Sequence, residues 1–127
     1  MANRIKKETA VNVNQILFCT DPQVSVGVQV SDTGITASNG KKIVKAGTPL
    51  AGSLEARGTA FAKAATTEGV SNAVGVLLHD VDVTDGANNG TLLIFGFVDL
   101  NKVDATTAAL ITADVKTALK GGVTFLK

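Results

Sequence analysis

Two apolar runs separated by a polar turn cluster constrain the fold of this chain most strongly. Residues 73–78 read Ala-Val-Gly-Val-Leu-Leu without a polar side chain, and residues 92–98 form a second run of the same kind. Residues 84–90 between them combine Thr, Asp, Gly and Asn, a composition typical of turns. A short, continuous apolar run is typical of a strand buried on both faces. We therefore predict an antiparallel pair of strands joined by a loose loop.

Three further segments have the pattern of short strands. Valine occupies every second position from 24 to 30, and this alternation predicts a half-buried strand. Turn signals at 31–34 and 38–40 enclose a possible short strand over 35–37, and residues 123–126 predict a closing strand. The glycines and proline of residues 46–52 predict a tight corner, and residues 54–67 predict a loop with at most a short helix.

One helix is predicted, near the C-terminus and about 13 residues long. Asp104, Thr106 or Thr107 can cap its start, and the glycine pair at 121–122 can end it. Its apolar residues recur at helical spacing: Ala108, Leu110, Ile111, Val115, Ala118 and Leu119. The predicted fold class is thus mainly β, with a single helix in the C-terminal region.

Length and composition indicate a single soluble domain. The chain has 127 residues, 45% of them apolar, and a formal net charge of +1. This balance argues against a disordered chain and against a dedicated nucleic-acid binder. The apolar runs are too short to span a membrane, no signal peptide is recognisable, and Cys19, the single cysteine, excludes an internal disulfide. We divide the chain into an N-terminal arm, residues 1–20, and one β-rich domain, residues 21–127; the arm either orders on a partner or is a frayed terminus.

The sequence offers no recognisable catalytic constellation. His79 is the only histidine, and neither Ser53 nor Ser71 has the glycine context of a nucleophilic serine. The glycines do not form a phosphate-binding or dinucleotide-binding motif. We therefore predict no catalytic residue, no cofactor site and no enzyme activity, and interpret His79 as lying at a strand end or a subunit contact.

Three aspartates in one short segment raise the question of a cation. Asp80 and Asp82 are expected on the same face of a strand, with Asp85 in the following turn, and oxygen-rich clusters suit calcium. The spacing does not match an EF-hand, because position six is Asp85 and position twelve is Thr91. The competing interpretation is a strand edge protected by charge, and we assign no metal site.

Charge and aromatic residues leave two further questions open. Residues 41–63 carry a net charge of +4 and residues 80–104 a net charge of −4, which indicates either solvated loops or electrostatic matching between copies in an oligomer. Similarly, four phenylalanines of the predicted domain either lie in the core of one protomer or are shared between subunits. These are Phe61, Phe95, Phe97 and Phe125.

Three segments together resemble a known family. They are residues 45–50 (an AGT-x-L corner), residues 73–86 (an AVG-x-LL strand that runs into D-V-D-x-T-D-G), and residues 93–100 (a strand that ends in G-x-V-x-L). In this order, followed by a helix and a closing GGVTF, they resemble head decoration proteins of tailed bacteriophages related to that of phage lambda. They are still more similar to phage head fiber proteins, above all over residues 73–100.

The resemblance implies a compact β-clip or β-barrel-like domain that assembles as a homotrimer on the capsid exterior. The implied partner is the major capsid protein, to which the N-terminal arm would add a strand, and no nucleic acid or membrane is involved. The implied location is the virion, with the host cytoplasm during assembly. The residues alone leave two alternatives open: a trimeric β-rich enzyme or small-ligand-binding protein with a site between subunits, and a carbohydrate-binding adhesion module on the virion.

Overall fold

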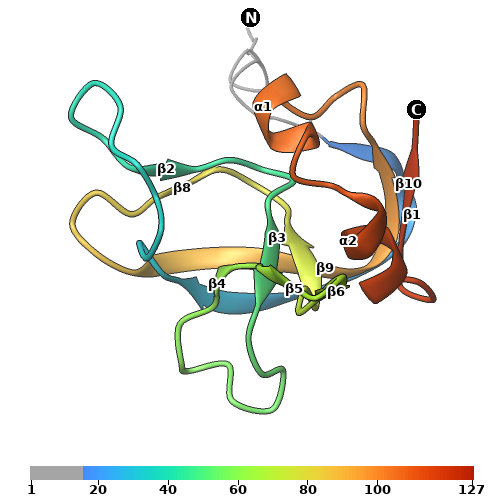
Figure 1. The fold of residues 1–127 in the computed structure, drawn as a ribbon, viewed down its shortest axis with the longest axis horizontal. Helices are drawn as coiled ribbons and strands as arrows, with labels where there is room; N and C mark the ends of the chain where they lie inside the picture. The colour runs from blue at the N-terminus through green and yellow to red at the C-terminus, as the bar shows by residue number, and fades with distance from the viewer. Residues whose placement is uncertain (1–15) are drawn as a thin grey trace, which may run out of the picture.

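Strands dominate the structure, a computed structural model that describes residues 16–127 (Figure 1). About 43% of the residues lie in strands and 9% in helices, which confirms the prediction of a mainly β domain. In chain order the elements are β1 (Leu17–Val30), β2 (Ile43–Val44), β3 (Pro49–Ala51), β4 (Ala62–Lys63), β5 (Thr66–Thr67), β6 (Val70–Ser71), β7 (Gly75–Leu77), β8 (Val81–Asp82), β9 (Asn88–Asp99), α1 (Ala105–Ala108), α2 (Ala113–Ala118) and β10 (Val123–Leu126).

Strand β9 lies at the centre of the main sheet. Along one edge it pairs antiparallel with β1, and along the other it pairs with β7 in antiparallel and with β10 in parallel orientation. Beyond β7 the sheet continues through β3 to β4 and stays open. The predicted pairing of the two apolar runs is confirmed, because Val76 lies opposite Leu93 and Leu77 lies opposite Leu92.

The main sheet has an apolar core on each face. Leu92 and Leu93 are neighbours in β9 and both are fully buried, with side chains on opposite faces. Leu93 packs in the core that contains Val115 of α2, and Leu92 packs in the core that contains Phe61. This double burial explains why the two central strands lack the alternation of polar and apolar residues that is typical of a sheet with one wet face.

The alternating valines form the second half of β1, as predicted. Val28 and Val30 are buried in the core around Phe61, and Val26 packs against that core. Val24 breaks the pattern and is 48% exposed. The register of β1 against β9 shifts between residues 24 and 25, so the alternation does not continue across this irregularity.

The predicted arm, residues 1–20, overlaps the first strand of the domain, because β1 begins at Leu17. Ile16 and Leu17 are buried in the core, and Leu17 lies opposite Val98 of β9. The backbone N–H of Asp99 also donates to the Ile16 carbonyl at 2.8 Å. Residues 17–20 therefore belong to β1, and the side chains of Ile16 and Leu17 complete the core beside it. The remainder of the predicted arm, residues 1–15, lies outside the described residues.

The helix predicted as one segment is in fact two short helices. Asp104 caps α1, as the sequence indicated, since its carboxylate accepts the N–H of Thr107. The hydroxyl of Thr112 then accepts the N–H of Val115 and begins α2 as a new helix. A threonine that caps a new start in this way competes with the continuation of the first helix. The break leaves Ile111, Val115 and Leu119 buried in one core, so the predicted apolar stripe is only partly realised.

Several short strands have no counterpart in the sequence prediction. Two pairs form outside the main sheet, β2 with β8 and β5 with β6, and β4 and β5 lie where a loop was expected. The predicted strand over residues 35–37 is not found; instead a single bridge joins Ser38 and Lys41. Within residues 16–127, no helix is both long and apolar enough to cross a bilayer.

Candidate functional site

Among residues 16–127, no serine or carboxylate forms a hydrogen bond or ion pair with His79. It is exposed in the bend that follows β7, and makes no hydrogen bond or ion pair with another described residue. Ser71 is buried, and its hydroxyl accepts the N–H of Ala73, which closes a local turn. Ser53 accepts the N–H of Glu55 in an exposed loop. The structure therefore does not bring the histidine and the serines together.

Asp80 joins two segments that are distant in sequence. One of its carboxylate oxygens accepts the backbone N–H of Ala46 at 2.7 Å, and the other lies 3.9 Å from the ammonium nitrogen of Lys45. The bond to Ala46 ties the start of β8 to the corner between β2 and β3. The carboxylate satisfies a backbone donor that the corner itself leaves without a strand partner.

Asp82 organises the loop that leaves β8. Its carboxylate accepts both the hydroxyl of Thr84, at 2.5 Å, and the backbone N–H of Thr84, at 2.9 Å. These two hydrogen bonds stabilise the charged form and lower the pKa of Asp82, with the hydroxyl bond as the larger cause. The Thr84 hydroxyl also accepts the N–H of Lys42 at 2.9 Å. Thus the loop and the residue preceding β2 are held together through a single threonine.

The three aspartates do not converge on a common point. Asp80 and Asp82 each direct their carboxylate at a different backbone segment, and Asp85 lies beside Asp82 at a shallow cavity in the turn that precedes β9. Nowhere in residues 16–127 does a group of three acidic, histidine or cysteine side chains have the geometry to hold a metal ion. We therefore interpret the aspartates as structural.

The AGT-x-L corner is fixed by its backbone. Gly47 has a φ of +98°, and a β-carbon at this position would lie 2.8 Å from a methyl group of Val103. Its N–H donates to the Leu77 carbonyl at 2.7 Å, and the N–H of Leu77 donates back to the Thr48 carbonyl. Thr48 is buried, and its hydroxyl donates to the Lys45 carbonyl at 2.7 Å. The corner therefore requires glycine for both its backbone conformation and its close packing.

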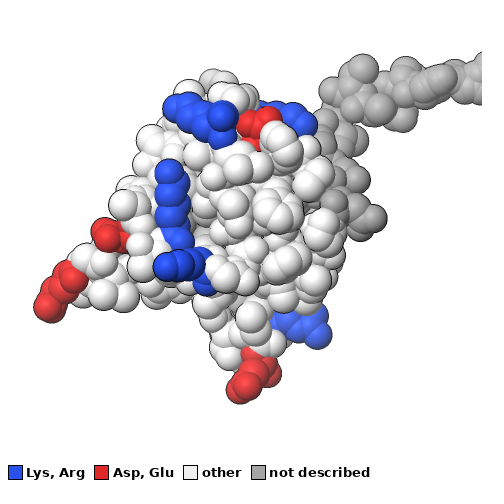
Figure 2. All heavy atoms as spheres, turned by 90° about the vertical axis from the view of Figure 1, so that its right-hand side faces the viewer, with Lys and Arg blue, Asp and Glu red and all other residues white. Residues whose placement is uncertain are grey.

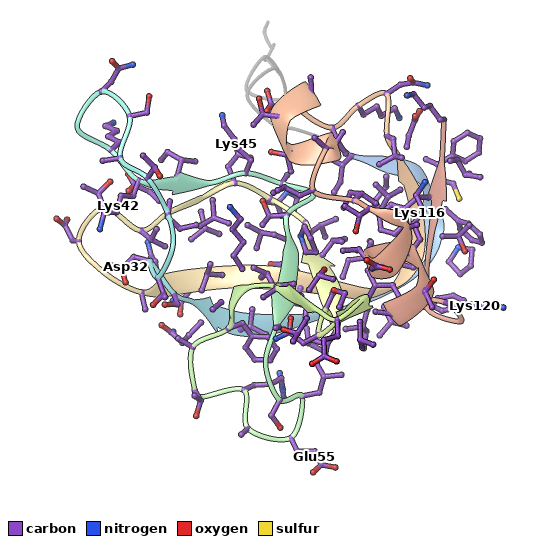
Figure 3. The ribbon with its side chains drawn as sticks, viewed as in Figure 1. Asp32, Lys42, Lys45, Glu55, Lys116 and Lys120 are labelled. Carbon is purple, nitrogen blue, oxygen red and sulfur yellow. The ribbon has the colours of Figure 1, made fainter. Side chains whose placement is uncertain are left out.

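Part of the charge asymmetry is matched inside the protomer. The basic segment of β2 lies along the acidic segment of β8, with Ile43 opposite Asp82. Lys45 approaches Asp80, and the positive charge of Lys41 contributes to the lowered pKa of Asp82. Lys42 pairs at 3.5 Å with a different residue, Asp32, on the left side of Figure 3. Within the described residues, two basic side chains of the first segment therefore approach acidic side chains of the second in the same chain.

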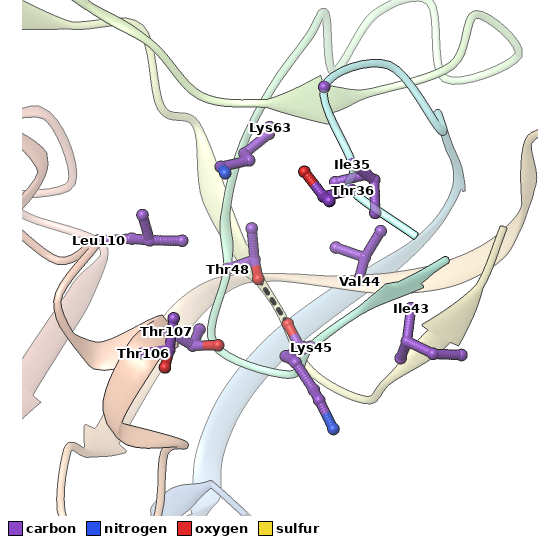
Figure 4. A pocket seen from close by; sticks show the side chains of 11 residues that line it. Ile35, Thr36, Ile43, Val44, Lys45, Thr48, Lys63, Thr106, Thr107 and Leu110 are labelled. Carbon is purple, nitrogen blue, oxygen red and sulfur yellow. Dashed lines mark hydrogen bonds between the residues drawn. The ribbon is translucent and has the colours of Figure 1, made fainter. Parts of the chain in front are cut away.

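A shallow cavity of about 240 Å³ lies between β2, β3 and α1. Figure 4 shows Lys63 of β4 reaching toward Thr48 and Leu110, whereas the side chain of Lys45 points away from the cavity. Thr107 of α1 closes the far side. Its described lining contains threonines, lysines and aliphatic side chains, and no carboxylate or histidine that would pair with them for acid–base chemistry. Sequence reasoning missed this cavity because its walls come from separate segments of the chain.

The phenylalanines divide between core and surface. Phe61 is fully buried, Phe97 and Phe125 are half-buried, and Phe95 is 39% exposed. Phe18, which falls in the predicted arm, is 57% exposed in β1. Large apolar side chains therefore remain on the surface at one end of the β1–β9 pair, which marks this end as a candidate contact surface.

The described residues therefore combine a fixed structural scaffold with an exposed apolar surface. Comparison with known proteins adds no assignment: no protein-family model matches the sequence, and no curated protein matches it.

Proposed function

We propose that the protein is a structural component of a bacteriophage virion. In this proposal it is a head decoration protein, or the base of a head fiber, that binds the outer surface of the capsid as a trimer and stabilises the shell. It acts without a cofactor and without turnover of a substrate. It is located on the capsid exterior, and in the host cytoplasm during assembly.

The observation that carries the proposal is the structural role of residues 73–86, the segment that most resembles the phage head proteins. Asp80 accepts the N–H of Ala46, Thr84 accepts the N–H of Lys42, and Asp82 holds Thr84, so the most recognisable motif shapes a scaffold. What the chain presents to solvent includes large apolar side chains on β1 and β9. A rigid β scaffold with exposed apolar surface fits a protein that binds other protein surfaces.

The proposed mechanism combines several weak contacts. Residues 1–15 would pair as an added strand with the major capsid protein, where main-chain hydrogen bonds supply the affinity. Three copies in one trimer would present three such segments, so each later contact forms at a high effective concentration. Binding to the assembled shell and not to its parts would stabilise the shell by linkage, by about 2.7 kcal/mol for each site at a concentration of 100 Kd.

Co-sedimentation with purified expanded capsids of the cognate phage tests the proposal. We expect saturable binding to the particles and a higher temperature for capsid disruption when the protein is bound. A variant with Val11→Asp and Val13→Asp should bind more weakly, because added charges oppose the pairing of this segment with an edge strand. A protein that binds no maturation state of the capsid would refute the proposal.

The enzyme alternative has its own test. The double variant His79→Ala/Asp82→Asn removes the side chains that a site between subunits would use. We expect unchanged capsid binding from this variant. If a turnover reaction of the wild-type protein disappears in the double variant, the enzyme alternative replaces the capsid proposal.

A further inference from the structure

Three large apolar side chains are exposed at one end of the β1–β9 pair. Phe18 is 57% exposed, Val24 is 48% exposed and Phe95 is 39% exposed. Val24 and Phe95 lie directly opposite each other on the two strands, and Phe18 lies between the residues paired with Phe97 and Val98. We call these three side chains the β1–β9 apolar surface. Exposed patches of this kind typically mark contact sites with another protein.

Exposed lysines border this surface. The Lys102 ammonium donates to the carbonyl of Leu17 at 3.1 Å, and Leu17 is the residue that precedes Phe18. Lys116 of α2 and Lys120 lie on the side of the molecule that carries β1 and β10 (Figure 3). Viewed from that side, the centre of the face has few charged side chains, and both basic and acidic side chains lie around it (Figure 2). None of these three lysines forms an ion pair with another described residue.

The β5–β6 hairpin has the complementary character. Val70 is 70% exposed, the largest value among the exposed large apolar side chains of the described residues. The turn before it consists of Glu68 and Gly69, both with positive φ, of 51° and 79°. Glu68 is exposed and forms no ion pair with another described residue. The hairpin thus presents one apolar side chain and one unpaired carboxylate at its tip.

The apolar surface and the hairpin lie on neighbouring sides of the protomer. Strand β6 packs against α2, and α2 packs against β10, so one helix separates the hairpin from the face of β1, β9 and β10. Two different surfaces that bind each other form a head-to-tail contact, which closes into a ring or continues as a filament. Because the two surfaces lie on neighbouring sides of the protomer, each copy in the assembly is rotated by a large angle relative to the previous one. A large rotation favours a closed ring of few copies.

We propose that the β5–β6 hairpin of one copy binds the β1–β9 apolar surface of the next copy. Val70 would pack against Phe95 and Val24, and Glu68 would approach the lysines at the border. The occupant is a second copy of this chain because the hairpin supplies both an apolar side chain for this surface and a carboxylate for the unpaired lysines beside it. The inference rests on the trimer of the proposed function and identifies the surfaces that form it.

Light scattering coupled to size-exclusion chromatography tests the contact with the full chain. We expect the mass of three protomers for the wild type. A surface variant, Val24→Thr/Phe95→Ser, and a hairpin variant, Val70→Ser, should each give the mass of one protomer. Leu54→Ser is the matched control: this side chain is 41% exposed but lies in neither surface, so the mass should stay at three protomers. Circular dichroism verifies that each variant remains folded.

Mixing the two monomeric variants distinguishes a head-to-tail contact from a symmetric one. The mixture retains one intact surface and one intact hairpin, so we expect a heterodimer that neither variant forms alone. Charge reversal gives a second readout. Glu68→Lys should raise the dissociation constant about tenfold or more, and adding Lys116→Glu and Lys120→Glu to the same chain should restore at least part of the affinity.

Three results would overturn the inference: a wild-type monomer at about 0.1 mM, a surface variant that keeps the mass of three protomers, or variants that form no heterodimer on mixing. Co-sedimentation with capsids is measured separately. A monomer that still binds capsids would refute the subunit contact alone, whereas a ring that binds no capsid would refute the proposed function alone.

Discussion

The Asp80 carboxylate accepts the backbone N–H of Ala46 at 2.7 Å, and this bond joins residues 34 positions apart in the chain. Asp80 follows the buried strand β7, and Ala46 begins the corner that leads to β3. Two segments that appear in the sequence as separate motifs are therefore parts of one structural unit. A hydrogen bond to a charged acceptor contributes about 1.5–3 kcal/mol, with the lower end applying to a partly exposed group such as this one.

Removal of this carboxylate should destabilise the fold. We expect Asp80→Ala to lower the free energy of unfolding by about 1–2 kcal/mol in urea titrations, because the Ala46 N–H loses its acceptor. Asp80→Asn should lose less, since its side-chain oxygen can still accept. Asp85→Ala is the control, because Asp85 lies in the nearby turn and forms no hydrogen bond with another described residue. Equal losses for Asp80→Ala and Asp85→Ala would contradict the role assigned to the Ala46 bond.

The lowered pKa of Asp82 should depend on Thr84. Because the folded-state pKa lies below the unfolded-state value, this carboxylate stabilises the fold above its unfolded pKa, and the contribution is lost as pH falls through the folded pKa. Thr84→Val removes the hydroxyl donor and should raise the pKa of Asp82 in an NMR titration of its carboxyl carbon. Thr84→Ser retains the donor and should leave the pKa low. An unchanged pKa in Thr84→Val would show that the hydroxyl is not its main cause.

Gly47 should not tolerate a side chain. Gly47→Ala introduces a β-carbon 2.8 Å from a Val103 methyl group at a φ of +98°. We expect a loss of about 2–3 kcal/mol in unfolding free energy, from backbone strain and steric overlap together. Gly40→Ala has a φ of +78° but no atom within 4 Å of the new β-carbon, so it isolates the strain. A smaller loss of unfolding free energy is expected for Gly40→Ala. Val103→Ala alone measures the cost of removing the valine methyl groups. If steric overlap matters, Gly47→Ala should cost less in the Val103→Ala background than in the wild type.

Two phenylalanines should lose very different amounts of stability on the same substitution. Phe61→Ala empties a fully buried site and should cost about 3–5 kcal/mol, measured by chemical unfolding. Phe18→Ala acts on a side chain that is 57% exposed, so it should cost less than about 1 kcal/mol in the monomer. Under conditions in which the protein self-associates, the Phe18 variant should instead weaken association. A large loss of monomer stability from Phe18→Ala would show that its ring is part of the protomer core.

The central strands were predictable from sequence because their signals are local and strong. A run without polar residues is favourable only when buried, so residues 73–78 and 92–98 indicate paired core strands by their composition alone. The valines at 26, 28 and 30 indicate one buried face for the same reason, since a period of two leaves little choice. The cap at Asp104 and the closing strand at 123–126 were likewise predictable from short patterns.

Other features depended on contacts between distant segments. Val24 follows the alternating pattern but is exposed, because the register of β1 shifts beside it. The predicted helix breaks at Thr112, where a capping hydrogen bond competes with helix continuation. Strands of two residues, such as β2 and β8, are too short to carry a periodic signal, and form only because a partner strand is held nearby.

The sequence by itself determined that this chain is mainly β and which residues form the middle of its sheet, since burial of apolar runs has few solutions. Only the tertiary structure decided what the charged and aromatic residues do. The carboxylates of Asp80 and Asp82 bind backbone groups of their own chain, and Phe61 is buried while Phe18 is exposed, although the sequence around each offers no means of distinguishing them. The physical reason is that hydrogen-bond partners and solvent exposure depend on which segments meet in space.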